Sequence, residues 1–139
     1  MVHALRRAGQ RLRSGGSLIS IRPHETQLPL VSVITPSRRI PVARLPTPGF
    51  DDRQSAADAA LQRVVAEGRF ALRGIRNHRY RSLLENPSQL RTYLELIIPP
   101  RPRFPPGRRA RLLQLWRSRP RGSRIEIAEW IVVMALRRR

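Results

Sequence analysis

The chain has 139 residues, the length of about one domain, and 28 basic residues against 9 acidic ones give it a formal net charge of +19. Every basic residue in that count is arginine, a pattern typical of codon bias in a GC-rich genome, although so high a charge also predicts non-specific adhesion to polyanions at low salt. The absence of cysteine excludes disulfide bonds, thiolate metal sites and cysteine nucleophiles.

The N-terminal third predicts a helix, a strand and a hairpin. Residues 3–13 carry apolar residues at helical spacing, and Gly15–Gly16 ends that helix. Residues 17–21 (SLISI) predict a strand that is apolar on both faces, as in the middle of a covered sheet. Residues 30–46 contain two β-rich runs around a turn at 36–39, and the prolines of the second run predict an edge strand.

The next segment predicts an amphipathic helix followed by a strand. The helix begins near Asp51–Asp52, which we interpret as capping residues rather than a catalytic pair, and ends at Gly68. Its apolar face comprises Ala57, Ala60, Leu61, Val64 and Val65. Residues 69–83 alternate apolar residues with arginine and predict a half-buried strand near an edge, with Gly74 as a candidate bulge.

The C-terminal part predicts two further helices and a last strand. Asn86, Pro87 and Gln89 form a capping pattern before a helix whose apolar stripe is Leu90, Tyr93, Leu94 and Ile97. Residues 99–107 are a stiff proline-rich connector, which we interpret as a spacer. Residues 108–118 predict a helix with Leu112, Leu115 and Trp116 inward. In the last strand, 131–134 is apolar throughout, so we expect both of its faces to be covered.

No segment has the character of a membrane helix or a signal peptide. The longest apolar stretch, residues 127–136, is far shorter than the ~20 residues that a membrane helix needs. The N-terminus is basic, but no apolar run of signal-peptide length follows it. We therefore expect a cytoplasmic protein without a membrane partner.

The order of these elements resembles the C-terminal half of a class I S-adenosylmethionine-dependent methyltransferase of the bacterial, small-molecule type. Leu12–Gly16 is similar to the Leu-Arg/Lys-Pro-Gly-Gly junction that precedes the family's fifth strand, with Ser14 in place of the proline. The phrase Ile21–His24, the Ala-rich segment 56–72 and the Arg-rich end IVVMALRRR are similar to segments of some bacterial branches. The resemblance covers nearly the whole chain.

The resemblance implies an α/β fold, or α+β as a fragment. Its partial Rossmann-like sheet has three core strands, of which the last is antiparallel and inserted between the other two, together with a hairpin insert and about four helices. The expected organisation is one domain over 1–139: a helix-GlyGly-strand junction (1–24), a hairpin insert (25–50), a helix-strand-helix segment (51–98), the proline-rich connector (99–107), and a helix with the terminal strand (108–139).

The same resemblance implies that the chain alone holds no cofactor. In the family, a Gly-x-Gly-x-Gly turn and an acidic residue of the N-terminal half hold S-adenosylmethionine, and none of the eight glycines here forms such a turn. The chain then corresponds to a fragment, a truncated reading frame or one partner of a split enzyme, without methyl-transfer activity of its own. Its open sheet edge would take an N-terminal methyltransferase half or a second copy.

Arg22, Pro23 and His24 are the candidate substrate-facing residues, because in the resembled fold they leave the carboxyl end of a strand. His24 is a candidate base or hydrogen-bond donor, and the alternative is a loop histidine satisfied by solvent or by Glu25. Glu129 interrupts an apolar strand and predicts a bulge or an arginine partner, with a functional carboxylate as the alternative.

The arginines leave a second class of function open. They are densest at 101–124 and 137–139, and no named nucleic-acid motif is present. Both tryptophans, Trp116 and Trp130, fall at expected core positions, so exposed aromatic residues for base stacking are not predicted. The alternative readings are a solvated cationic surface and a small arginine-rich module that binds nucleic acid or another polyanion. The three histidines do not predict a metal site.

Overall fold

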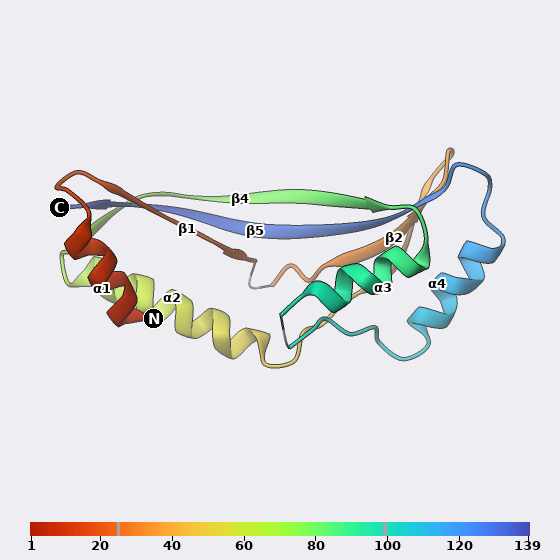
Figure 1. Cartoon of the computed structure of the whole chain (residues 1–139), viewed down its shortest axis with the longest axis horizontal. Coiled ribbons are helices and arrows are strands. Elements are labelled where there is room, and N and C mark those ends of the chain that lie inside the picture. Colours follow the sequence, from red (N-terminus) through yellow and green to blue (C-terminus); the bar gives the residue numbers. More distant parts are fainter. Residues whose placement is uncertain (25, 99) are drawn as a thin grey trace. The chain divides into compact units, whose positions relative to one another are not determined.

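The computed structural model describes residues 1–24, 26–98 and 100–139, without the side chains of Phe50 and Asp51, and has a mixed α/β architecture (Figure 1). Its elements, in chain order, are α1 (Val2–Arg11), β1 (Ser17–Pro23), β2 (Leu30–Ile34), β3 (Arg39–Arg44), α2 (Phe50–Ala66), β4 (Phe70–Leu84), α3 (Pro87–Leu96), α4 (Arg108–Arg117) and β5 (Arg124–Arg138). Among the described helices, none is long and apolar enough to cross a membrane.

The last strand, β5, is the centre of an antiparallel sheet. It pairs with β1 through its segment 131–137 and with β2 through its segment 124–128. It also pairs with β4, and β3 joins the sheet through β2. The expected antiparallel last strand between two others is confirmed, and the hairpin β2–β3 belongs to the same sheet. As its prolines predicted, β3 is an edge strand.

Residue contacts divide the chain into two units. Unit 1 contains Met1–Glu25, Gly49–His78 and Ile131–Arg139, and unit 2 contains Thr26–Pro48 and Arg79–Trp130. The two long strands β4 and β5 contribute residues to both units. Each unit has its own hydrophobic cluster, so the two are described separately below.

In unit 1, α2 packs its predicted apolar face into a cluster made of Leu61, Val64, Phe70, Met134 and Leu136. Gly9 of α1 lies directly against the Phe70 ring, and a Cβ at Gly9 would lie 3.1 Å from Cζ of that ring. Gly68 follows the helix with a φ of 72°, a left-handed conformation that glycine adopts without strain.

The predicted capping role of Asp51 and Asp52 is wrong. The N-cap of α2 is Gly49, which makes no side-chain cap, and both aspartates lie inside the first turn of the helix. Acidic residues in that turn interact favourably with the helix dipole, which is why they resembled a cap in the sequence. The side chain of Asp51 lies outside the described residues.

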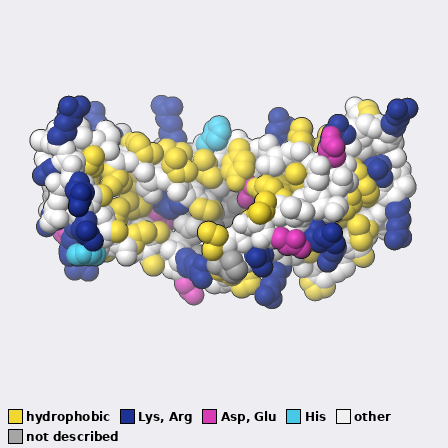
Figure 2. Space-filling view, in the orientation of Figure 1, with side chains coloured by type: hydrophobic (Ala, Val, Ile, Leu, Met, Phe, Trp, Pro, Cys, Tyr) yellow, Lys and Arg dark blue, Asp and Glu magenta, His cyan; other side chains and the backbone are white. Residues whose placement is uncertain are grey.

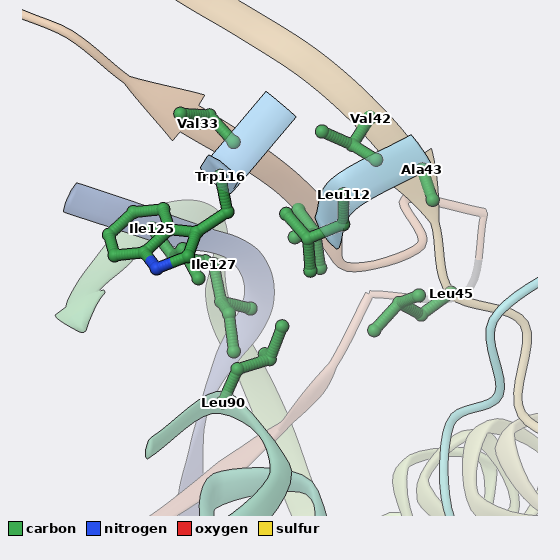
Figure 3. Close-up of a cluster of buried hydrophobic side chains, with 10 residues drawn as sticks. Val33, Val42, Ala43, Leu45, Leu90, Leu112, Trp116, Ile125 and Ile127 are labelled. Atoms are coloured by element: carbon green, nitrogen blue, oxygen red, sulfur yellow. The ribbon is translucent and has the colours of Figure 1, made fainter. Parts of the chain in front are cut away.

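In unit 2, helices α3 and α4 pack on the segment of β5 that begins the strand. Figure 3 shows Leu90 of α3 and Leu112 and Trp116 of α4 together with Ile125 and Ile127. The predicted cap of α3 is confirmed: the backbone N–H of Gln89 donates to Asn86 Oδ1 at 2.9 Å. The Gln89 side chain accepts in turn from the Glu85 backbone N–H at 2.7 Å.

Three predictions of burial are wrong, because apolar character in a strand does not reveal which faces are covered. Strand β1 ends the sheet order and leaves Ile19 and Ile21 53% and 65% exposed. In β5, Val132 and Met134 are buried, whereas the alternate residues Ile131 and Val133 are only half-buried. Beyond Phe70, β4 is largely exposed on both faces. The bulge at Gly74 stays a prediction.

Candidate functional site

The predicted substrate-facing residues Arg22, Pro23 and His24 lie at the end of β1, and the Arg22 side chain is held in an ion pair. Arg22 forms an ion pair with Asp58 of α2, and its side chain is 14% exposed. Nothing in the sequence marks Asp58, 36 residues away, as its partner. Within the described part of the chain, Arg22 Nη1 is buried without a hydrogen-bond partner. The substrate-facing role of the trio stays a prediction.

Glu129 binds two tyrosines rather than the predicted arginine partner, and the bulge at this position stays a prediction. Tyr80 of β4 donates its hydroxyl to Glu129 Oε2 at 2.7 Å, and Tyr93 of α3 donates to the same oxygen. Burial, and then the neighbouring carboxylate, raise the pKa of both phenols above the ordinary value. Both tyrosines therefore stay protonated and act as hydrogen-bond donors.

Glu126, also in β5, is the buried acid that arginines surround. Its side chain is 1% exposed, and Oε1 lies 2.5 Å from Arg39 Nη2 of β3. From β4, Arg81 Nη1 lies 3.5 Å from Oε2 and Arg79 Nη2 lies 3.9 Å from Oε1. One carboxylate thus faces three guanidinium groups and neutralises only one of their charges. We call Glu126, Arg39, Arg79 and Arg81 the Glu126 cluster.

The arginines of the Glu126 cluster also reach solvent. Their side chains are 33% exposed at Arg39, 35% at Arg79 and 65% at Arg81. The Arg79 guanidinium carbon lies 5.9 Å from the centre of the Trp130 ring, a cation–π contact on a half-buried tryptophan. The expectation that Trp130 belongs to the core is therefore only partly met. A buried carboxylate holds the three guanidinium groups close together while their outer N–H groups stay accessible.

Strand β4 carries further arginines in unit 1. A shallow groove of about 550 Å³ is lined by Arg73, Gly74, Arg76, Asn77, His78, Val133 and Ala135. In the described part of the chain, neither Arg73 nor Arg76 has an acidic partner, whereas Arg69, the residue before the strand, contacts Glu67 at 3.2 Å. The groove thus has an apolar floor from β5 and a cationic wall from β4.

Figure 2 shows exposed hydrophobic side chains and arginines side by side on one face of the molecule. In unit 1 the half-exposed floor of the groove continues into β1, because Val133 pairs with Ile21 and Ala135 pairs with Ile19. No aromatic side chain lines the groove among its described residues. This arrangement suits contacts to phosphate groups better than base stacking.

The residues that the structure describes contain no group of three or more His, Asp or Glu side chains that could hold a metal ion. The chain matches no protein-family model, no curated protein and no solved structure.

The sequence did not indicate a site at the arginines of β4, because arginines are denser along the chain at 101–124 and 137–139. Arg79 and Arg81 stand two residues apart in a predicted strand, a spacing that places both side chains on one face. Glu126 and Glu129 both interrupt the apolar last strand, and an arginine partner was predicted for Glu129, whereas the ion pairs of the structure are made by Glu126. Arg39 could not be foreseen, because only the pairing of the hairpin with β5 brings it there.

Proposed function

We propose that the chain binds the phosphate backbone of nucleic acid through the arginines of β4 that line the groove of unit 1. The proposal rests on the charge of that groove: Arg73 and Arg76 of this exposed strand have no acidic partner among the described residues and stand beside the apolar floor made by Val133 and Ala135. Guanidinium groups fork onto phosphate oxygens and are always charged.

The expected binding is independent of base sequence. The described lining of the groove offers arginines for phosphate groups but no aromatic side chain on which a base could stack. Contacts to phosphates do not distinguish one base from another. Such binding releases condensed counterions, so its affinity falls steeply as the salt concentration rises. A net charge of +19 attracts any polyanion, so the proposal is distinguished from general adhesion only by which arginines matter.

The test compares two double variants of equal charge. Arg73→Gln with Arg76→Gln removes two arginines of the groove, and Arg111→Gln with Arg117→Gln removes two exposed arginines of α4. Fluorescence anisotropy with a labelled duplex, between about 50 and 200 mM salt, gives the slope of log affinity against log salt. We expect the groove variant to lower the magnitude of the slope by about 2 and the α4 variant to leave it nearly unchanged. Equal changes in both variants would assign the binding to net charge and contradict the proposal.

We propose as a second candidate that the chain is the C-terminal segment of a methyltransferase-like fold. The position of β5, antiparallel between β1 and β4, supports it, since the resembled family places its last strand in this way. Under this proposal the pocket for the methyl donor belongs to residues other than those of this chain. Isothermal titration with S-adenosylmethionine is then expected to give no binding, and micromolar affinity would contradict this assignment.

A further inference from the structure

A second groove lies in unit 2, on different elements from the arginines of β4. It has a volume of about 540 Å³ and runs between α3, the proline-rich connector and the start of α4. Pro87, Leu90, Arg91, Leu94 and Glu95 of α3 face it at the spacing of one helical stripe. We call it the α3–α4 groove.

The walls of the α3–α4 groove are held in place by backbone contacts. Arg101 Nε donates to the carbonyl oxygens of Glu95 and Ile97, both at 3.1 Å, and so satisfies free carbonyls at the end of α3. The Arg103 backbone N–H donates to Pro46 O at 2.9 Å. Phe104 packs against the cluster of Figure 3. The groove is therefore preformed, which lowers the entropic cost of binding a ligand.

The floor of the groove is apolar, and its rim is cationic. Leu90 and Leu112 are buried at its base, while Leu94, Phe104 and Leu113 remain partly accessible. Arg91, Arg103 and Arg109 stand on three different walls, and their guanidinium groups have no acidic partner in the described part of the chain. Glu95 is the acidic residue of the lining.

We propose that the α3–α4 groove binds an acidic amphipathic helix of a partner protein. A ligand with one anionic head group would pair with one wall and leave the arginines of the other walls unmatched. A helix that inserts an apolar stripe and carries carboxylates on both sides of it matches the apolar floor and the cationic walls together. The prolines of the connector lack N–H donors, so recognition here rests on side chains rather than on strand addition.

Two labelled probe peptides of about 14 residues test this proposal by fluorescence polarisation. One has leucines three and four residues apart with glutamates on both sides of the stripe, and the other is a scramble of the same composition. We expect the ordered peptide to bind at least about tenfold more tightly at physiological salt. Equal affinities would show that only charge is recognised and would overturn the proposal.

Matched variants locate the binding site. Arg91→Glu with Arg109→Glu is expected to weaken binding of the ordered peptide by about tenfold or more, whereas Arg111→Glu with Arg117→Glu is expected to weaken it by less than about threefold. Circular dichroism verifies that both variants stay folded. As a second readout, the ordered peptide should shift the NMR signals of Phe104 and Leu94 but not those of Ile19 in unit 1. Equal loss in both variants, unshifted Phe104 and Leu94 signals, or a duplex that binds this groove in place of the peptide, would overturn the assignment.

Discussion

A Phe70→Ala variant is expected to lose about 3–5 kcal/mol of unfolding free energy, the range for removing a large buried aromatic side chain. Phe70 is fully buried in the cluster of unit 1, where α1, α2 and β5 all contribute residues to its surroundings. The substitution removes the ring that lies against Gly9 of α1 and leaves a cavity in its place. Chemical denaturation followed by circular dichroism measures the loss, and Leu72→Ala, an exposed position on the same strand, is the control.

Because Gly9 lies against the Phe70 ring, substitutions at these two positions should affect the free energy of unfolding in a coupled way. Alanine is worth about 1 kcal/mol more than glycine inside a helix, but a Cβ at residue 9 would lie 3.1 and 3.2 Å from two atoms of the buried ring. Gly9→Ala should therefore fail to stabilise the parent chain and should stabilise the Phe70→Ala variant. A double-mutant cycle measures this coupling, and additive effects of the two substitutions would show that the ring does not restrict residue 9.

The sequence predicted those elements whose signals are local. The Asn86 cap and the Gly68 stop depend on residues within one helical turn of each other, and both were found where the pattern placed them. The central place of β5 was anticipated from its apolar run together with the resemblance in element order. Patterns of this kind identify an element, but they do not identify its neighbours.

What the sequence did not predict depends on those neighbours. Ile19 and Ile21 are exposed on β1, the strand at the end of the sheet order, and their apolar character gives no sign of that position. Tyr80 and Tyr93 meet Glu129 because α3 packs against β5, and the side chains involved are far apart in the sequence. The Glu126 cluster likewise depends on pairing, since the hairpin that carries Arg39 pairs with β5 through β2.

Glu126→Gln is expected to lower the free energy of unfolding by about 3 kcal/mol, although the substitution changes the size of the side chain very little. Removing one partner of a buried ion pair typically costs 3–5 kcal/mol, because the remaining charge has lost its compensation. We expect the lower end of that range, since the three arginines are between 33% and 65% exposed and can turn toward water. Mutual repulsion of the three guanidinium groups around an uncharged amide is part of this expected loss.

The arginines of the cluster should contribute unequally, and this distinguishes a charge effect from simple packing. Arg39→Gln leaves Glu126 with Arg79 and Arg81, so its cost should be smaller than that of Glu126→Gln. In the Glu126→Gln background, Arg39→Gln should recover part of the lost stability, because it removes one of three uncompensated charges. Thermal and urea unfolding of the four chains of this cycle measure the coupling.

Glu85→Gln is the matched control, because this carboxylate is 64% exposed and its contact with Arg124 is 3.7 Å long. Its loss should stay within about 0.5 kcal/mol, as for most exposed ion pairs. A Glu126→Gln variant as stable as the Glu85→Gln variant would show that solvent already screens the cluster. Arg79 and Arg81 would then be held by their strand alone, and a role for Glu126 in holding the guanidinium groups of its cluster together would be excluded.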